Sequence, residues 1–457
     1  MTINSLTKYP AGGVRELFSL SVPIFFSIIS SNLMLFCDRY FLSQFSLETF
    51  NAVGVASYLV LLFQIACIRF SSISQVFIGR CLGNKTVHNI GPYTWQMIWG
   101  SLLTFFIITP IGIAASEFYF TGIENGSLGK TYFLIMLFGN FLFPLGATLA
   151  AFQLGLGKTK ILSIAALISN FLNIILDYYL INGISNLLDP MGVKGAAIAT
   201  LISQGTYCAI LFFLFINHPL KNDYKTKDFY FRPALFKESS LVGFNSAFAK
   251  VIAFSIWTVS INIVAVKGGD YVTLISFGST ICILFSIISE PISKGLIILF
   301  SYFLGQNNWR YILKSFRSGV ILMTMAFGLL TIPFVIYNRL LIEAIIGTSV
   351  NETTLGFLRL GCYWLWIYFL IEGISFCFIN LIIAMKETYF LLKIAPLLSF
   401  SAIYLPFYLS FKIGSLNPDK IWVIVWINYV ISYLIYSLKI FRLYKKSQEI
   451  ILQKDSV

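Results

Sequence analysis

Two aspartates stand inside long apolar stretches, and they carry the clearest chemical signal in the chain. Asp38 lies within residues 17–41, and Asp177 lies within residues 161–181. A carboxylate near the middle of a bilayer costs about 2.5–3.5 kcal/mol on insertion scales, so by default it is a functional group. Because almost the whole chain consists of apolar stretches, these aspartates predict a carrier of ions or protons.

Further polar side chains accompany Asp177 at helical spacing. Asn170, Asn173 and Asp177 are three and four residues apart, which places them on one face of a helix. Their oxygens could bind a hard cation such as Na⁺ or share a proton. They could equally hydrogen-bond to neighbouring helices and hold a bundle together. The residues alone leave both interpretations open.

The other reactive residue types do not form a catalytic or metal centre. Seven cysteines lie in or beside apolar stretches without CxxC spacing, and His88 and His218 fall in predicted loops. Residues 155–159 resemble part of a phosphate-binding loop, but Phe152 stands where that loop needs its first glycine. We predict a helix-ending turn there. We expect no enzyme, no cofactor and no metal other than Na⁺.

The elements that must position the two aspartates are membrane-spanning helices. Hydrophobic residues make up 58% of the 457 positions and charged residues 11%, whereas a soluble domain has about 25% charged residues. A span needs about 20 mostly apolar residues. Twelve stretches qualify: 17–41, 51–79, 93–115, 131–154, 161–182, 193–216, 239–266, 271–304, 312–337, 355–384, 390–411 and 421–441. The fold class is therefore predicted to be all-α integral membrane, with twelve transmembrane helices.

Charge in the connections predicts the orientation. Lys and Arg gather in alternate connections, and the positive-inside rule places those connections, with both termini, in the cytoplasm. The net charge of +13 then reflects the bilayer, so membrane lipids are expected partners and nucleic acid is not. The polar N-terminus shows no cleavable signal.

The two halves of the chain resemble one another weakly. The second span ends in Cys81-Leu82-Gly83-Asn84 and the eighth in Phe303-Leu304-Gly305-Gln306. Parallel repeats of this kind carry a binding site near the midplane. We predict an N-lobe over 1–217 with spans 1–6, a cytoplasmic inter-lobe loop over 218–238, a C-lobe over 239–442 with spans 7–12, and a cytoplasmic tail over 443–457.

Four stretches resemble the multidrug and toxic compound extrusion (MATE) family, over most of the chain. They run from Glu16-Leu17-Phe18 through Pro23 to Asp38; over 51–57, NAVGVAS; from QLGLGKTK at 153–160 to 170–180; and over GVKGAAIAT at 192–200. The resemblance implies two six-helix lobes around a V-shaped central cavity. It also implies export of drugs or organic metabolites by alternating access, driven by H⁺ or Na⁺.

The resemblance also assigns roles residue by residue. Asp38, Asn173, Asp177 and Thr200 match the family's cation or proton site in the N-lobe, where Na⁺ would meet the first three. Pro23 matches the proline at which the first helix bends. Glu372, on the tenth span, matches an acid found in the C-lobe of some members.

Arg69 departs from the family's pattern, because a small or apolar residue usually stands at this point of the second span. Its charge could pair with Asp38 or Asp177 and replace a bound cation, which would remove Na⁺ coupling. Alternatively, it lies toward the cytoplasmic end of a tilted helix and extends its guanidinium to the interface.

Four charges mark the C-lobe: Lys250, Glu290, Lys294 and Glu372. Glu290 and Lys294 are four residues apart and can pair along one helix face. The four groups could neutralise one another, form a second coupling site, or attract an anionic substrate through the lysines. A substrate unlike the usual cationic drugs is therefore open.

The predicted function is a cation-coupled antiporter that acts as a monomer on a small amphipathic, cationic substrate. The nearest alternative is a flippase for a lipid or lipid-linked oligosaccharide, with the C-lobe lysines holding a phosphate. A membrane-embedded transferase is a remote alternative, because it needs a large loop or a His/Asp pair near an interface. A scaffold without transport would leave the buried charges without a purpose.

Overall fold

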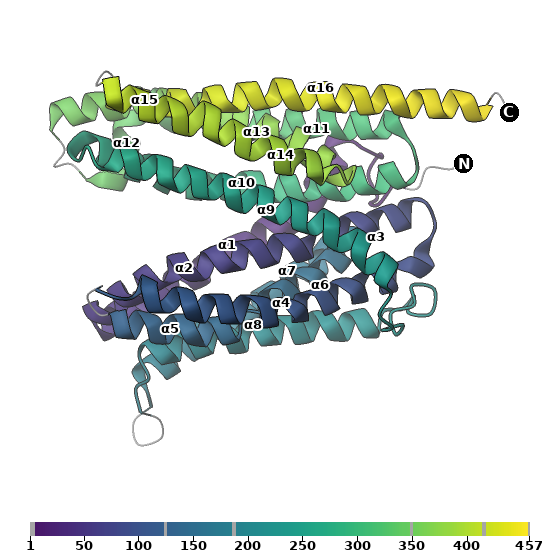
Figure 1. Cartoon of the computed structure of the whole chain (residues 1–457), viewed down its shortest axis with the longest axis horizontal. Coiled ribbons are helices and arrows are strands. Elements are labelled where there is room, and N and C mark those ends of the chain that lie inside the picture. The colour runs from purple at the N-terminus through teal and green to yellow at the C-terminus, as the bar shows by residue number, and fades with distance from the viewer. Residues whose placement is uncertain (1–4, 123–125, 185–188, 348–350, 414–416, 456–457) are drawn as a thin grey trace. The chain divides into compact units, whose positions relative to one another are not determined.

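The computed structural model describes residues 5–122, 126–184, 189–347, 351–413 and 417–455, which fold mainly into long helices (Figure 1). The ends of the predicted N-lobe and tail, 1–4 and 456–457, lie outside the described residues. The α-helices are α1 (Val14–Phe45), α2 (Leu47–Ser72), α3 (Ser74–Gly83), α4 (Ile90–Tyr119), α5 (Gly126–Phe138), α6 (Leu142–Gly155), α7 (Thr159–Asn182), α8 (Val193–Ile216), α9 (Pro233–Ala265), α10 (Gly269–Gly305), α11 (Trp309–Leu329), α12 (Asn338–Ile346), α13 (Glu352–Ala384), α14 (Thr388–Ser399), α15 (Leu405–Ile413) and α16 (Ile421–Asp455). Short 3₁₀ turns (Val87–Asn89, Pro418–Lys420) and π-helices (Ile332–Ile336, Phe400–Tyr404) join some of them.

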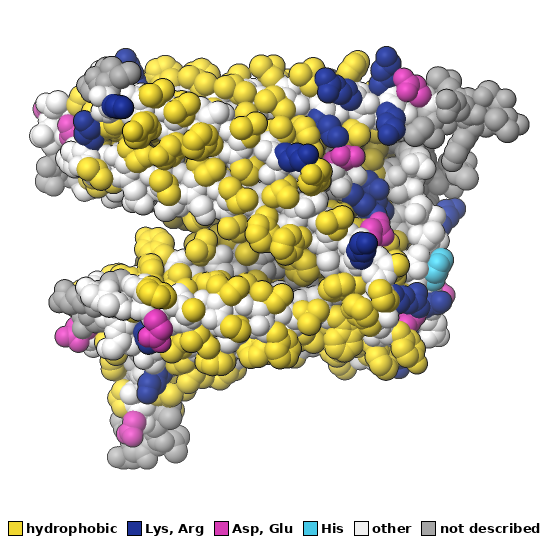
Figure 2. Space-filling view, in the orientation of Figure 1, with side chains coloured by type: hydrophobic (Ala, Val, Ile, Leu, Met, Phe, Trp, Pro, Cys, Tyr) yellow, Lys and Arg dark blue, Asp and Glu magenta, His cyan; other side chains and the backbone are white. Residues whose placement is uncertain are grey.

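The predicted number of spans is confirmed. Within the described residues, eleven helices are long and apolar enough to cross a membrane, and the bent pair α5–α6 supplies a twelfth span. The limits follow the apolar stretches closely, as in α7 and α8. On the face drawn in Figure 2, hydrophobic side chains cover the middle of the helices, while Lys and Arg gather toward their ends. This pattern is that of a multi-pass membrane protein.

Four spans are interrupted within stretches that look continuous in sequence, and one of them, 51–79, breaks at Ile73 between α2 and α3. The predicted span 131–154 is the pair α5–α6, which bends by 44° between Phe138 and Leu142. The π-helix Ile332–Ile336 contains Pro333, and the π-helix Phe400–Tyr404 follows Pro396. Proline removes a helical N–H donor and clashes with the preceding turn, so a locally wider turn is a common solution.

Helix ends follow local signals. The Ser46 hydroxyl accepts a hydrogen bond from the Thr49 backbone N–H at 3.1 Å and caps α2. The Asn351 side chain does the same for α13, accepting from the Thr354 N–H at 2.7 Å. Gly183 ends α7 with a φ of 80°, a conformation that L-residues with a side chain rarely adopt.

The chain forms two compact units. Unit 1 comprises Met1–Phe18, Phe248–Phe300 and Trp309–Val457, and unit 2 comprises Ser19–Ala247 and Ser301–Asn308. Unit 2 therefore holds the first six spans almost whole, whereas unit 1 holds most of the last six. The lobe boundaries placed at the inter-lobe loop stay a prediction.

The N-terminal segment joins unit 1 through a buried glutamate. Glu16 is fully buried, and its carboxylate accepts hydrogen bonds from the backbone N–H groups of Leu6 at 3.0 Å and Gly12 at 2.6 Å. The Ser318 hydroxyl, from α11, donates to the Gly12 carbonyl at 2.8 Å. These bonds hold the residues before α1 against α11.

The two glycines that the internal repeat equates pack against one another within unit 2. A Cβ on Gly83 would lie 2.1 Å from the Tyr302 carbonyl oxygen and 3.1 Å from the Gly305 Cα. A Cβ on Gly305 would lie 2.4 Å from the Arg80 carbonyl oxygen and 3.0 Å from the Gly83 Cα. Such close backbone contact between helices requires residues without a side chain.

We expect Gly83→Ala to lower the thermal unfolding midpoint of the purified protein, because the added methyl group overpacks a backbone contact at a cost of about 1–3 kcal/mol. Gly205→Ala, within α8, is the matched control. A Cβ there meets nothing within 4 Å, and alanine favours helix by about 1 kcal/mol. Equal midpoints for the two variants would contradict the close contact.

Candidate functional site

The site is built along a seam between α1 and α7. The Ser163 hydroxyl on α7 donates to the Pro23 carbonyl on α1. One heptad further on, the Asn170 amide donates to the hydroxyls of Ser30 at 2.9 Å and Ser31 at 3.2 Å. A second heptad leads to Asp177, which interacts electrostatically with Asp38. Because the sequence offset stays near 140 throughout, the two helices run in the same direction and in register along this seam.

The sequence of α7 explains which face lines the seam. Ser163, Asn170, Asn173 and Asp177 are all buried, whereas the opposite face carries large exposed apolar side chains. These are Ile164, Leu167, Ile168 and Phe171. In a bilayer a polar stripe turns toward the bundle interior and an apolar stripe turns toward lipid.

Asp177, Asn173 and Thr200 come together as the resemblance implies. In the amide orientation that satisfies both neighbours, Asn173 donates to Asp177 Oδ2 at 2.9 Å and accepts from the Thr200 backbone N–H at 3.3 Å. The Thr200 hydroxyl donates to the Ala196 carbonyl of its own helix at 3.0 Å. Thr200 therefore contacts Asn173 through its backbone N–H, because its hydroxyl is bonded to the Ala196 carbonyl.

The two carboxylates are left with unpartnered oxygens. Asp177 is fully buried and Asp38 is 5% exposed. Among the described residues, neither Asp38 Oδ1 nor Asp177 Oδ1 has a hydrogen-bond partner. Two neighbouring buried carboxylates repel when both are ionised, so the pair favours uptake of a proton or a cation. A proton or a hard cation on these oxygens would remove that repulsion.

Two residues that the sequence did not single out also belong to the site. Arg39 interacts electrostatically with Asp38, and its guanidinium lies 6.0 Å from the Phe50 ring centroid. Tyr132, buried on α5, lies within electrostatic reach of Asp38, Arg39 and Asp177. The Asp38-Arg39 dipeptide inside an apolar stretch was a usable signal for Arg39, but nothing in the sequence near Tyr132 marks it.

Arg69 lies far from the two aspartates along the helices, and its place at the cytoplasmic interface stays a prediction. It is exposed in the last turn of α2. Ser46 separates α1 from α2. At 1.5 Å per residue, Asp38 lies ~12 Å from Ser46 along α1, and Arg69 lies ~35 Å from Ser46 along α2. Hence the pairing of Arg69 with either aspartate is not seen, and Arg39 is the base beside the site.

The C-lobe charges fall into two arrangements, both in unit 1. Lys294 Nζ lies 2.8 Å from Glu290 Oε1, so the predicted pair on one face of α10 forms. Glu372, on α13, accepts hydrogen bonds from the hydroxyls of Tyr368 at 2.8 Å and Tyr429 at 3.1 Å. Lys250 lies close enough to interact electrostatically with Glu372.

The turn after α6 contacts the end of α8 through a histidine. Lys158 Nζ lies 2.6 Å from His218 Nε2, and the Leu220 backbone N–H donates to His218 Nδ1 at 3.2 Å. The imidazole also stacks on Tyr224, with the ring centroids 5.0 Å apart. Burial and then the Lys158 ammonium lower the pKa of His218 to about 4, and burial also lowers the pKa of Lys158.

Comparisons with known proteins show which proteins the chain resembles. A family model described as MatE matches residues 23–179, which include Asp38, Asn173 and Asp177. The probable multidrug resistance protein NorM of Thermotoga maritima is 26% identical over 331 residues, which cover 70% of this chain and 69% of that protein. The N-terminal part of the chain thus matches the MatE family, and the relative found over most of the chain is named as a multidrug resistance protein.

Solved structures with the same fold span nearly the whole chain. A MOP superfamily transporter from Pyrococcus furiosus has a TM-score of 0.82 at 15% identity, covering 95% of this chain and 97% of its own. An outward-facing multidrug resistance MATE transporter has a TM-score of 0.81 at 17% identity, covering 97% and 100%. At these identities the likeness shows the fold.

Because His218 is buried, we predict that the stability of the folded protein depends on pH. The folded protein keeps His218 neutral to about pH 4, whereas the unfolded chain protonates near pH 6.5. Unfolding therefore takes up a proton below pH 6.5, and the stability due to this group is lost as the pH falls from 6.5 toward 4. We expect the midpoint of His218→Asn to fall less than that of the wild type between pH 7.5 and pH 4.5. Parallel curves for the two proteins would contradict this.

Proposed function

We propose that this protein is a MATE antiporter that exchanges H⁺ or Na⁺ for an amphipathic organic cation, by alternating access across a bacterial-type inner membrane. The observation that carries the proposal is the pair Asp38 and Asp177, buried on neighbouring helices, each with one oxygen that has no hydrogen-bond partner among the described residues. The basic connections favour a topology with both termini in the cytoplasm.

Ion binding at Asp38 and Asp177 would act directly on the conformation of α1. When both carboxylates are charged, their repulsion opposes close contact between α1 and α7 at this end of the seam. A proton or Na⁺ removes that repulsion, and the Asn173 amide holds Asp177 in place to receive it. Pro23 lies inside α1 and provides a position at which the helix can bend. Ion uptake would thus alternate α1 between two conformations.

The available energy is sufficient for this cycle. Moving one elementary charge across a potential of 100 mV yields about 2.3 kcal/mol. Inserting a single unpaired carboxylate costs about 2.5–3.5 kcal/mol on insertion scales. Neutralising and recharging one of the two aspartates is therefore of the same order as one translocated ion.

We expect Asp38→Asn and Asp177→Asn to abolish gradient-driven uptake of a cationic dye by inverted membrane vesicles, because an amide cannot take up a proton and is a weak Na⁺ ligand. Asp189→Asn is the matched control, since Asp189 is exposed outside the spans. Uptake is compared under an imposed pH gradient without Na⁺ and under an Na⁺ gradient at equal pH. The gradient that supports uptake identifies the ion.

Unchanged coupling in both aspartate variants would sink this mechanism, provided that the amounts of protein in the vesicles are equal. Loss of uptake in Asp189→Asn as well would show a general effect of charge removal. Binding of dye to the variants, measured by fluorescence polarisation, separates lost coupling from lost folding.

The surroundings of Glu372 favour a cationic substrate. Its carboxylate sits among aromatic rings: Tyr368 lies 5.4 Å from Tyr429 and 6.0 Å from Trp422 between ring centroids. Aromatic faces attract lipophilic cations, and a nearby carboxylate adds charge complementarity. Lys250 close to Glu372 moderates that charge. The Pyrococcus furiosus transporter is described as having a binding pocket of reverse polarity, so the sign of the substrate is a point for experiment.

We expect Glu372→Gln to weaken binding of a cationic dye about tenfold, because one charge-assisted interaction contributes about 1.5–3 kcal/mol. Binding of a neutral dye of similar size should change little. Glu343→Gln removes a half-buried acid that pairs with Arg339 and serves as the control. Equal loss for the neutral and cationic dyes would assign Glu372 to packing instead.

The flippase alternative depended on free lysines in the C-lobe. Lys294 is held by Glu290 at 2.8 Å, and Lys250 lies near Glu372. Both lysines thus have an acid beside them, which lowers their capacity to hold a phosphate. The geometry favours the antiporter.

A further inference from the structure

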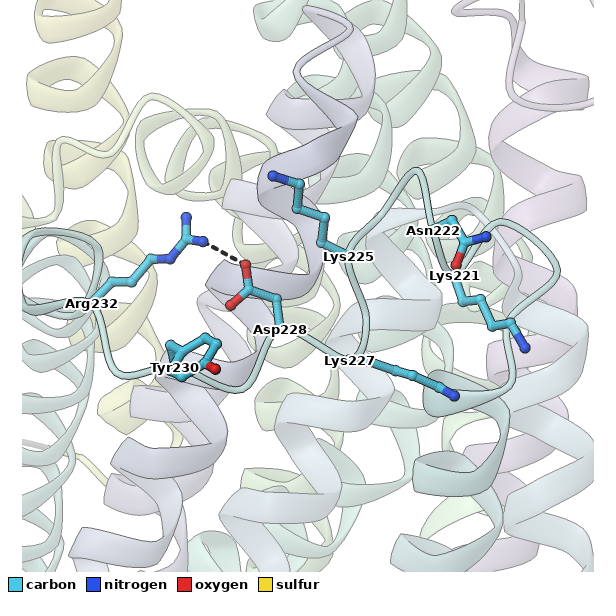
Figure 3. Close-up of a pocket in the computed structure, with 7 residues that line it drawn as sticks. All are labelled: Lys221, Asn222, Lys225, Lys227, Asp228, Tyr230 and Arg232. Carbon is cyan, nitrogen blue, oxygen red and sulfur yellow. Dashed lines mark hydrogen bonds and ion pairs between the residues drawn. The ribbon is translucent and has the colours of Figure 1, made fainter.

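The connection between α8 and α9 forms a basic pocket at the end of the membrane-spanning helices (Figure 3). The pocket has a volume of ≈ 520 Å³, within the range of small-molecule sites. Four of its lining residues are basic: Lys221, Lys225, Lys227 and Arg232. The loop comes directly after Ile216, the last residue of α8, and directly before Pro233, the first residue of α9. The pocket therefore lies where lipid headgroups meet the protein.

This loop is held in a fixed conformation by α4. Trp95 and Trp99 donate from their indole N–H groups to backbone carbonyls of the loop, and Gln96 makes one bond as donor and one as acceptor. The bonds are Trp95 to Thr226 at 2.7 Å, Trp99 to Phe229 at 3.0 Å, Gln96 to Tyr230 at 3.0 Å, and the Arg232 N–H to Gln96 at 2.9 Å. A preorganised loop loses little conformational entropy when it binds a ligand.

The backbone also holds one lysine in a conformation that few residues adopt. Lys225 has a φ of 51°, in the left-handed region. The Gly91 N–H donates to the Tyr224 carbonyl at 2.8 Å. A Cβ on Gly91 would lie 2.2 Å from the Lys225 carbonyl oxygen, so only glycine allows this approach. Packing against α4 thus holds Lys225 in this uncommon backbone conformation. Such conformations are often found at binding sites.

The positive charge of the pocket is only partly neutralised. Arg232 pairs with Asp228, as Figure 3 shows. Lys221, Lys225 and Lys227 make no ion pair with any carboxylate in the described part of the chain. In the view of Figure 3, the side chains of Lys221 and Lys227 extend toward the same side of the loop. Lys225 extends to the other side of the loop, and the one acid that lines the pocket, Asp228, pairs with Arg232. The local excess of positive charge favours a bound anion.

Exposed aromatic side chains stand directly beside this charge. Phe229 is 54%, Tyr230 is 70% and Phe231 is 52% exposed. Aromatic residues at the ends of spans sit at the level of the lipid headgroups. The ligand that fits both features carries a phosphate and an apolar chain. We propose that residues 217–232 bind the phosphate headgroup of an anionic phospholipid in the adjoining leaflet.

This proposal is independent of the transport mechanism, because none of its residues belongs to the seam between α1 and α7. Its test uses the full-length protein in detergent. Phosphatidylglycerol, phosphatidylcholine with the same acyl chains, or inorganic phosphate is titrated in. Bound lipid is counted by native mass spectrometry, and the thermal midpoint is followed in parallel.

We expect phosphatidylglycerol to be retained and to raise the midpoint, with little effect from phosphatidylcholine or inorganic phosphate. The triple variant Lys221→Gln, Lys225→Gln, Lys227→Gln should weaken binding of phosphatidylglycerol about tenfold or more, since each lysine near an anionic surface contributes appreciably. The matched control is Arg442→Gln, Lys445→Gln, Lys446→Gln. It removes the same charge from exposed positions near the end of α16, and it should bind as the wild type does.

Three outcomes would overturn the proposal. Equal loss in the control variant would show a diffuse attraction to charge. Equal stabilisation by inorganic phosphate would assign the pocket to the free anion. Undiminished retention of phosphatidylglycerol in the loop variant would exclude the pocket. The midpoint of each variant without lipid confirms that it folds.

Discussion

A carboxylate inside a membrane protein has no water to stabilise its charge, and the helices of unit 2 are arranged around that constraint. Asp177 is held by Asn173, Asn173 is held by the Thr200 amide, and Asp38 faces Asp177 from α1 beside Arg39. Each of these residues comes from a helix whose opposite face is apolar. The polar side chains therefore determine which face of each helix turns inward, and this determines how the first, fifth and sixth spans pack.

The remaining charges are handled differently according to depth. Glu290 and Lys294 pair within one helix, and Glu372 is stabilised by two tyrosine hydroxyls. At the helix ends, lysines and arginines stay near the headgroup level, where the loop between α8 and α9 presents several of them. The same residue type thus marks topology in one place and forms a pocket in another. The difference lies in whether neighbouring helices fix the backbone that carries it.

Much of the fold could be predicted because hydropathy is a property of each stretch by itself. The twelve spans, the helical face of Asn170, Asn173 and Asp177, and the pair Glu290–Lys294 all depend on spacing within one helix. What could not be predicted depends on other helices. Tyr132 reaches the site from α5, and the hydroxyl of Thr200 turns to its own backbone. Arg39 is marked in sequence by its place next to Asp38 in an apolar stretch, but its electrostatic interaction with Asp38 depends on the conformation of the side chains. The bend between α5 and α6 lies inside an unbroken apolar stretch.

The contacts of α1 with α7 recur at two-turn intervals, and this periodicity limits how the first helix can move. Their register is set at Pro23, at Ser30 and at Asp38, and the next matching register lies seven residues away, a shift of about 10.5 Å. A piston-like slide of one or two residues would put hydroxyls and amides opposite methyl groups at every level at once. If α1 instead rolls or bends, some of these contacts with α7 are kept while others are broken. These contacts therefore favour a progressive separation of α1 from α7, beginning at one end, over a slide along the helix axis.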